Sequence, residues 1–548
     1  MTPPRRTPYW TLPAFILLIL MPAPWATALL ATAAAVAAGR GIRARALVRR
    51  TEARAASEAI VLGADRRGST VYLTDRELSA HGLIVGASGA GKSTTLLRIL
   101  TEQIRRGRPV IAIDMKGSPA FADVLAEAAG AAGRPFVTWS IDGPAHWNPL
   151  QHGNATELKD KLIATERFTE PHYQRAAERY VQIVLRVLSE SRPGRSPALA
   201  EVVDLMDPVR LPRLLRGVEV DLRERIQDYL AGLTGDQLSA IRGLQTRLAV
   251  LTESHTAPYL GPPAPSGGGP SIDLRHALQG PEVVLFSLNS SRYGKLAAQL
   301  GTLAVQDLVS AAGDRLSEIA YGRRIEPAII GLDEFSALGA DHVIALLSRA
   351  RESGMSALVA TQELVDLERA APGLRDQVVG VTALKIIHRQ ETPRSAEMLA
   401  QMAGTQLVWE HTRQTASRLI GYDTGRGTRR QVERYVVHPN EIKGLGTGEA
   451  IVISKLGDAP PRWVRITPPG VEPPTATSTR RETSATRETQ ATRETSAGRE
   501  PSATREPSAA REQPIIKPSH RPWGPRAGRG PREAGPGRRA PEPPERDR

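Results

Sequence analysis

The stretch Gly86-Ala87-Ser88-Gly89-Ala90-Gly91-Lys92-Ser93 fits the pattern G-x-x-x-x-G-K-[ST] at every fixed position. Apolar residues 83–85 precede it as a short buried strand, and residues 94–100 follow it as the opening of a helix. A phosphate-binding loop requires this order of strand, loop and helix. Its glycines let backbone N–H groups approach the phosphates, and the helix N-terminus adds a partial positive charge. The stretch therefore predicts a P-loop that binds a nucleoside triphosphate.

The side chains of this loop have separate expected roles. Lys92 is expected to reach the β- and γ-phosphates, and the Ser93 hydroxyl is expected to hold Mg²⁺. The predicted nucleotide-binding residues are Gly86, Ala87, Ser88, Gly89, Ala90, Gly91, Lys92, Ser93 and Thr94.

A second motif follows far along the chain, where the apolar run 327–332 ends in Asp333-Glu334. This is the Walker B pattern, in which a strand brings its terminal carboxylates beside the P-loop. Asp333 is expected to share the Mg²⁺ with Ser93, and Glu334 to orient and deprotonate the attacking water. The glutamate indicates hydrolysis rather than binding alone. The sequence has no N-K-x-D motif for guanine and no L-S-G-G-Q motif, so ATP with Mg²⁺ is the expected ligand pair.

Two polar residues beyond the Walker B strand complete the predicted catalytic set of Glu334, Gln362 and Arg351. Gln362 ends the next strand, where a polar side chain can sense the γ-phosphate. Arg351 is placed to reach a neighbouring subunit's nucleotide as an arginine finger. The alternative is that Arg351 is a solvated helix residue and that Gln362 is an ordinary surface side chain.

The pattern of strands predicts the fold class. Apolar strand-like runs occur at 110–114, 283–288, 328–332, 357–361, 384–388 and 450–454, and helical stretches separate most of them. Alternating strands and helices favour a parallel α/β sheet with both faces covered. We therefore expect a RecA-like P-loop domain.

The long interval between the two motifs has its own pattern. Residues 156–259 are almost wholly helical in pattern, with apolar residues at helical spacing over 175–188 and 222–251, and residues 261–270 form a Gly/Pro-rich connector. An all-helical domain inserted into the nucleotide-binding domain explains this interval.

Composition limits the remaining possibilities. The net charge is +14, but residues 1–50 hold seven Arg and no acidic residue, and residues 471–548 hold 16 basic and 11 acidic residues. The body between these ends is nearly neutral, so charge alone gives no strong electrostatic footprint for a polyanion. The chain has no Cys, which excludes disulfides and thiolate zinc sites.

The N-terminal segment predicts a membrane anchor. Residues 9–39 carry no charge, and Pro22 and Pro24 interrupt them. This length suits either one tilted or kinked helix or a tight hairpin bent at the prolines. Arginines flank both sides, and the positive-inside rule places the main body in the cytoplasm. A cleaved signal peptide is the alternative, but the apolar stretch is too long for one, and a P-loop ATPase outside the cell would lack nucleotide.

The C-terminal segment is of low complexity. Arg-Glu recurs every six residues from Arg481 to Arg511, and Pro, Gly and Arg dominate residues 521–548. A period of six fits neither helix nor strand, so the segment is expected to be disordered. It is either a solvated repeat tail or a partner-docking tail.

The chain resembles the type IV coupling proteins of conjugation and secretion systems, which are of the TraD/TraG type. These proteins belong to the wider HerA/FtsK class of ring ATPases. The resemblance covers about residues 75–460. It rests on the P-loop, on the stretches 114–117 (DMKG) and 147–150 (WNPL), on 332–339 (LDEFSALG), on 350–354 (ARESG) and 360–362 (ATQ), and on a closing segment at 437–450.

The resemblance implies a homo-hexameric ATPase at the bacterial inner membrane with its body in the cytoplasm. Its expected partners are single-stranded DNA with a relaxase or nucleoprotein cargo, secretion channel components and the lipid bilayer. It also implies the sensor role for Gln362 and the trans role for Arg351. One departure is the compressed N-terminal membrane region, which puts the mode of docking to a channel in doubt.

Four segments are expected: a membrane anchor at 1–50, a P-loop domain made of 51–155 and 271–466, an inserted all-α domain with its linker at 156–270, and a disordered tail at 467–548. Two other functions stay open. One is an FtsK-like double-stranded DNA translocase, and the other is an ATP-gated module that docks protein cargo of a secretion system.

Overall fold

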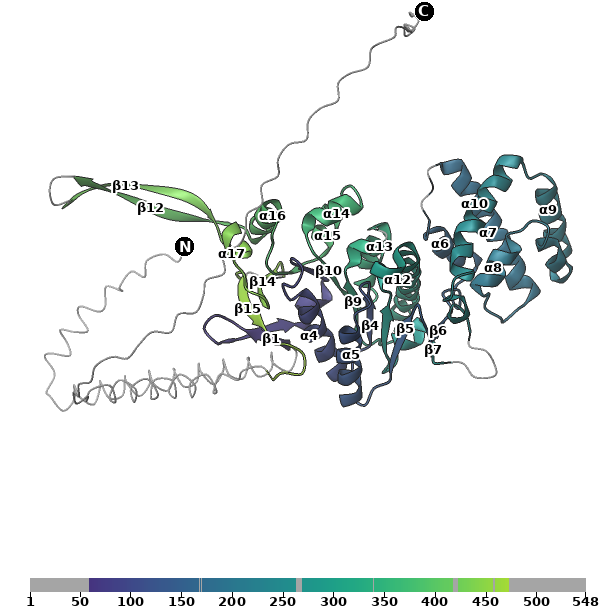
Figure 1. The fold of residues 1–548 in the computed structure, drawn as a ribbon, viewed down its shortest axis with the longest axis horizontal. Helices are drawn as coiled ribbons and strands as arrows, with labels where there is room; N and C mark the ends of the chain where they lie inside the picture. Colours follow the sequence, from purple (N-terminus) through teal and green to yellow (C-terminus); the bar gives the residue numbers. More distant parts are fainter. Residues whose placement is uncertain are drawn as a thin grey trace, which may run out of the picture. The chain divides into compact units, whose positions relative to one another are not determined.

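The computed structural model describes residues 59–472, apart from 167, 169, 263–268, 339, 417–421 and 457–458. Its centre is an 11-stranded sheet with the strand order β2-β1-β15-β14-β11-β3-β10-β9-β4-β8-β5 (Figure 1). Helices connect most neighbouring strands of its larger half. The predicted α/β class is therefore confirmed.

The larger half of the sheet is parallel and contains both motifs. Its strands are β3 (Gly82–Val85), β4 (Val110–Asp114), β5 (Phe136–Ser140), β8 (Val283–Ser287), β9 (Ala328–Asp333), β10 (Met355–Thr361) and β11 (Leu384–Ile387). The P-loop follows β3 and the Walker B carboxylates end β9, with β10 between them. Because parallel strands end at one edge, both motifs meet at the carboxyl edge of the sheet.

The smaller half is antiparallel, which the sequence did not predict. It contains β1 (Ala59–Ala64), β2 (Thr70–Thr74), β14 (Glu449–Ser454) and β15 (Arg462–Ile466), and β14 joins it to β11. The sheet is thus mixed. Strands joined by short turns can pair antiparallel without a crossover helix, and β1 and β2 are such a pair.

Alternate residues of the parallel strands face two hydrophobic cores. Leu83 and Val85 of β3 belong to one core, and Ile84 belongs to the other. Helices α4 (Lys92–Arg105) and α5 (Pro119–Ala131) cover the core of Ile84. Helices α12 (Ser290–Ala320) and α13 (Ala340–Ala350) cover the core of Leu83. A central strand buried on both faces explains why β3 is a continuous apolar run.

The interval between the motifs leaves and re-enters the sheet domain at one point. Strands β6 (His146–Trp147) and β7 (Ser271–Ile272) pair in parallel, so the two ends of the interval lie side by side. Between them the described residues form only helices: α6 (Ala155–Ile163), α7 (Pro171–Ser191), α8 (Leu199–Leu205), η1 (Leu211–Gly217), α9 (Val220–Ala231), α10 (Gly235–Thr252) and η2 (Ala257–Tyr259). Their apolar faces join the core that α12 covers.

A buried ion pair fastens this helical segment to α12. Lys161 Nζ lies 2.7 Å from Asp307 Oδ1, and the indole N–H of Trp147 donates to Asp307 Oδ2 at 3.1 Å. All three side chains are buried. Each charge is therefore both paired and hydrogen-bonded, as burial of a charge requires.

Strands β12 (Thr405–Ala416) and β13 (Tyr422–Tyr435) form a separate antiparallel hairpin. Among the strands that the structure describes, they pair with each other and not with the large sheet. The remaining helices are α3 (Asp75–Ser79), α11 (Leu274–Ala277), η3 (Phe335–Ala337), α14 (Leu364–Ala370), α15 (Leu374–Val381), α16 (Pro393–Ala403) and α17 (Pro439–Lys443).

Two predicted segments lie outside this description. The N-terminal anchor within residues 1–50 and most of the C-terminal tail, from residue 473 onward, fall outside the described residues. Of the helices that are described, none has the length and apolar character needed to cross a membrane. The predicted transmembrane segment therefore stays a prediction.

Candidate functional site

Residues 86–93 form a tight loop at the carboxyl end of β3. Gly89 has a φ of 71° and Gly91 a φ of 113°, which are left-handed conformations that favour glycine. At Gly86 a Cβ would lie 2.5 Å from the Cβ of His388. Helix α4 begins at Lys92, so the last two residues of the motif form its first turn. The loop therefore has the backbone geometry that a phosphate cradle needs.

Strand ends around the loop fix its position. Three backbone hydrogen bonds do this: from Gly86 to the carbonyl of Gln362 (3.1 Å), from Ala87 to that of Arg389 (2.8 Å), and from Gly448 to that of Ala90 (3.0 Å). The loop thus connects to the segments that follow β10 and β11 and to the one that precedes β14.

The Lys92 side chain is folded back over the loop. It is buried, and its Nζ donates to the carbonyl oxygen of Ala87 at 3.1 Å. Burial lowers the pKa of Lys92, and the charge of Lys116 lowers it further, whereas Glu334 and Asp333 act against the shift. The Lys92 ammonium can therefore give up its hydrogen bond to the Ala87 carbonyl and bind phosphate oxygens instead.

The Ser93 hydroxyl donates to Asp333 Oδ2 at 2.7 Å, so the two predicted metal ligands lie in contact. Asp333 is 1% exposed. Its other oxygen, Oδ1, has no hydrogen-bond partner among the described residues. A buried carboxylate oxygen without a donor is suited to a cation or to its bound water.

Asp114 stands beside Asp333 in register, at the end of β4. Its carboxylate accepts hydrogen bonds from the backbone N–H groups of Lys116 (2.9 Å) and Ser118 (2.7 Å). Burial raises the pKa of Asp114. Asp114 therefore shapes the turn that carries Lys116.

Lys116 joins the two Walker B carboxylates. Its Nζ lies 3.1 Å from Glu334 Oε2 and 3.4 Å from Asp333 Oδ2. Although burial opposes the shift, these two carboxylates raise the pKa of Lys116. The sequence predicted no role for this lysine. The available signal was its place in the stretch 114–117 (DMKG), directly after an apolar strand-like run.

The backbone at Glu334 is unusual for a residue with a side chain. Its φ is 58° and its ψ is 45°. Non-glycine residues in this region cost about 1 kcal/mol or more and cluster at functional sites. The turn directs the chain from β9 into η3 immediately after Asp333.

Gln362 lies at the same edge of the sheet as the P-loop. Its carbonyl accepts the hydrogen bond from Gly86, and its side chain is half-buried. Thr361, which precedes it, is fully buried, and the Thr361 hydroxyl has no hydrogen-bond partner among the described residues. The predicted sensor position is therefore next to the loop.

Arg351 lies at the opposite edge. It is exposed and precedes β10, whose seven residues span about 20 Å before Thr361 is reached. Its charge acts on His81, at the amino end of β3. Within one chain, Arg351 is therefore far from the P-loop that it was predicted to serve in a neighbouring subunit.

His388 is a buried residue behind the P-loop that sequence reasoning missed. Its Nδ1 lies 2.9 Å from the carbonyl oxygen of Glu449, and its Nε2 lies 2.9 Å from the Thr95 hydroxyl. Burial lowers the pKa of His388 to about 4. The ring is then neutral near pH 7, with Nδ1–H donating to the carbonyl and Nε2 accepting from Thr95.

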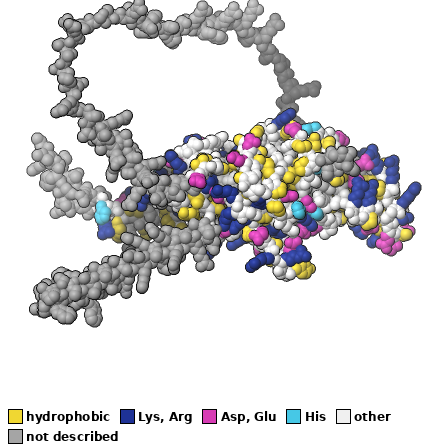
Figure 2. Space-filling view, turned by 90° about the horizontal axis from the view of Figure 1, so that it is seen from below, with side chains coloured by type: hydrophobic (Ala, Val, Ile, Leu, Met, Phe, Trp, Pro, Cys, Tyr) yellow, Lys and Arg dark blue, Asp and Glu magenta, His cyan; other side chains and the backbone are white. Residues whose placement is uncertain are grey.

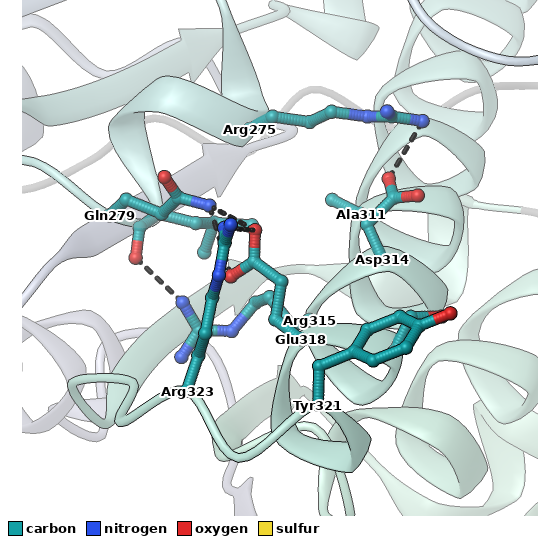
Figure 3. Close-up of a pocket in the computed structure, with 10 residues that line it drawn as sticks. Arg275, Gln279, Ala311, Asp314, Arg315, Glu318, Tyr321 and Arg323 are labelled. Carbon is teal, nitrogen blue, oxygen red and sulfur yellow. Dashed lines mark hydrogen bonds and ion pairs between the residues drawn. The ribbon is translucent and has the colours of Figure 1, made fainter.

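A cavity of about 370 Å³ lies between α11 and the C-terminal part of α12 (Figure 3). Polar side chains of its wall contact one another: Arg275 pairs with Asp314 at 2.7 Å, and the Gln279 amide donates to Glu318 at 3.1 Å. Buried Arg315 donates to the carbonyls of Leu278, Ser353 and Glu326. The helices that line the cavity precede β8 and β9, so it lies near the amino edge of the sheet and is not part of the nucleotide site.

These features define a P-loop nucleotide-binding domain of the α/β class, with hydroxyl, carboxylates and lysines converging at one edge of a parallel sheet.

Comparison with known protein families gives two matches. A family model for the TraM recognition site of TraD and TraG matches residues 327–446, and a model for the FtsK/SpoIIIE family matches residues 41–117.

Solved structures share the fold. The bacterial conjugative coupling protein TrwBΔN70, in its unbound monoclinic form, is 16% identical, with a TM-score of 0.53 over 72% of this chain and 87% of that chain. The plasmid coupling protein TrwB in complex with the non-hydrolysable GTP analogue GDPNP is 16% identical, with a TM-score of 0.52 over 72% of this chain and 88% of that chain. A search of curated proteins gives no match. The resemblance to the type IV coupling proteins is confirmed by these matches.

Proposed function

We propose that this protein is a membrane-anchored ATPase that couples ATP hydrolysis to the transfer of DNA or nucleoprotein in conjugation or type IV secretion. The observation that carries the hydrolytic part is the contact of Ser93 with Asp333, beside Glu334 and Lys116. The similarity to coupling proteins carries the choice of DNA as substrate.

The residues of the site fit ATP and Mg²⁺. A Cβ at Gly86 would lie 2.5 Å from that of His388, and Gly89 and Gly91 have positive φ values that favour glycine. Lys92 Nζ donates to a loop carbonyl, and Asp333 Oδ1 lacks a donor among the described residues. The P-loop N–H groups and Lys92 would hold the triphosphate, and Ser93 and Asp333 would hold Mg²⁺. When bound, Mg²⁺ neutralises charge that develops on the phosphate oxygens.

The acid–base work falls to Glu334. Its carboxylate would accept the proton of the attacking water, because Glu334 directly follows Asp333 at the end of β9 and shares the contact with Lys116. Lys116 would hold this carboxylate in position through the 3.1 Å contact between its Nζ and Glu334 Oε2. Gln362 would report the state of the γ-phosphate to β10, since its own carbonyl is bonded to the P-loop.

The assembly and the location are part of the proposal. An arginine at the amino edge of the sheet can serve a nucleotide only in another subunit, which supports a ring, and a homo-hexamer is the proposed form. Residues 9–39 would anchor the ring in the bacterial inner membrane, with the body in the cytoplasm. A relaxase or nucleoprotein cargo and channel components are the proposed partners.

The test is the ATPase rate of the purified protein with and without single-stranded DNA, for wild type and for Lys92→Ala. We expect DNA to stimulate the wild type and Lys92→Ala to be inactive in both conditions. Full turnover by Lys92→Ala would contradict the P-loop mechanism. If the wild type is active but DNA does not stimulate it, the ATPase activity is supported and DNA as the substrate is contradicted.

A second candidate is a translocase of double-stranded DNA, favoured by the FtsK/SpoIIIE match at residues 41–117. Stronger stimulation by duplex than by single strands would support it.

A further inference from the structure

The β12–β13 hairpin is a two-stranded sheet apart from the large sheet, and its exposed surface has no role in the nucleotide site. A two-stranded hairpin alone is at best marginally stable in water, so a long one calls for a partner. Here Leu407 is 69% exposed and Trp409 is 42% exposed. The 12 residues of β12 span about 40 Å.

The hairpin concentrates positive charge. Residues 405–435 contain six Arg and three acidic residues, whereas the whole of residues 51–470 carries a net charge of only +2. The net positive charge of the hairpin alone is therefore larger than that of residues 51–470 as a whole. On the face of the molecule seen in Figure 2, by contrast, basic and acidic side chains lie interspersed.

The register places an aromatic ring among these arginines. Trp409 stands opposite Gln431, and His411 stands opposite Arg429, so these four share one face of the ribbon. The Arg429 guanidinium lies 4.2 Å from the centre of the Trp409 ring. An arginine stacked on an indole leaves its N–H edge free for a phosphate, and an exposed indole offers a surface for a base.

Arginines stand on the opposite face too. Arg430 and Arg434 both contact Glu410, at 3.2 and 2.6 Å, and their side chains are 71% and 61% exposed. One carboxylate between two guanidiniums leaves an excess positive charge on this face. Both faces therefore carry exposed arginine.

We propose that this hairpin is a nucleic-acid-binding arm that contacts single-stranded DNA through Trp409 and the arginines 429, 430 and 434. Protein–protein interfaces have cores depleted in charge, whereas nucleic-acid interfaces are polar and strongly positive. The composition of the hairpin matches the second kind. The inference rests on the proposed function, because it names where the transported DNA is contacted.

The experiment measures binding of a fluorescent single-stranded oligonucleotide to the purified full chain over a range of NaCl concentrations. The variants are Trp409→Ala and Arg429→Gln/Arg430→Gln. The control is Arg369→Gln on α14, an arginine that is 79% exposed and paired with Asp366. Binding of a fluorescent ATP analogue shows that each variant has folded.

We expect Trp409→Ala to weaken DNA binding about tenfold. The double arginine variant should weaken it about tenfold at low salt and reduce the slope of log K against log salt by about 1.4, because two phosphate contacts are lost. Arg369→Gln should bind as the wild type does.

Three outcomes would overturn the inference. If the wild type binds DNA and all variants bind equally, the hairpin arm is wrong and the proposed function stands. If the wild type does not bind DNA, the result contradicts both the hairpin arm and the proposed function in DNA transfer. If the variants lose oligomer mass in sedimentation while each protomer keeps its DNA affinity, the hairpin is instead a contact between copies of the chain.

Discussion

Ser93 and Asp333 are 240 residues apart in the sequence, and a hydrogen bond of 2.7 Å joins their side chains. The contact exists because β3 and β9 lie in one sheet with β10 between them, all running in the same direction. Strands that run in parallel deliver their carboxyl ends to one edge. A residue of a loop motif and a residue of a strand motif, which we propose as Mg²⁺ ligands, are thereby brought into contact.

Asp333→Asn tests this pair. Asparagine keeps the shape and an acceptor for Ser93 but removes the charge that Mg²⁺ requires. We expect the ATPase rate to fall at least about 100-fold and the Mg²⁺ concentration for half-maximal rate to rise. The measurement is ATPase rate against Mg²⁺ concentration. An unchanged Mg²⁺ dependence would contradict the assignment of Asp333 as a ligand.

Glu334→Gln separates hydrolysis from binding. The amide cannot accept the proton of the attacking water, so turnover should fall about 100- to 10,000-fold. The affinity for an ATP analogue should stay within about threefold, because the P-loop contacts remain. A variant that loses nucleotide affinity and turnover equally would show that Glu334 is structural.

Arg351→Ala should abolish ATPase activity because the neighbouring subunit's nucleotide site loses this side chain. Arg351 lies about 20 Å along β10 from the P-loop edge, so it can act only on another subunit's nucleotide. Mixed rings of Arg351→Ala and Glu334→Gln should regain part of the activity, because some sites then receive both groups. Arg349→Ala, a neighbouring exposed arginine, is the control. Mixed rings without recovered activity would contradict the trans role.

His388 should make stability dependent on pH. Its pKa is about 4 in the folded protein and near 6.5 when unfolded, so the unfolded state binds more protons between these values. Stability is therefore full above about pH 6.5 and is lost as the pH falls towards 4, by at most about 3 kcal/mol. His81, whose pKa burial also lowers to about 4, adds a similar loss.

The measurement is the melting temperature between pH 7.5 and 4.5 for wild type and His388→Asn. Asparagine can still donate to the Glu449 carbonyl but does not titrate here. We expect a lower melting temperature at pH 7.5 and a shallower fall towards pH 4.5. A slope equal to that of the wild type would show that His388 is not the titrating group.

Lys161→Met should destabilise the fold strongly. It leaves Asp307 buried without its cation, which costs about 3–5 kcal/mol. Chemical denaturation of wild type and variant gives the difference. Lys161→Met combined with Asp307→Asn should recover part of the loss, because the unpaired charge is gone while an acceptor for Trp147 remains. A double variant as unstable as the single one would indicate lost packing rather than lost charge.

The local motifs were predictable because each is written in a few consecutive residues. The six strand-like runs expected from apolar pattern all lie on strands of the large sheet, with ends that differ by at most two residues. The antiparallel half was missed. Strands β2 and β15 mix polar and apolar residues, and β1, although it is a continuous apolar run, carries no signal of the direction in which it pairs. The hairpin was missed because both of its faces mix polar and apolar residues, so alternation gives little signal.

The sequence by itself determined the P-loop, the Walker B carboxylates and the α/β class, because glycine conformations, a strand's apolar run and a helix start are local properties. Only the tertiary structure decided that Lys116 contacts Glu334, that His388 supports the P-loop, and that Arg351 lies at the far edge of the sheet. These relations depend on which strands are neighbours and on their direction. Strand order arises from packing between residues distant in the chain, and no stretch of a few residues specifies it.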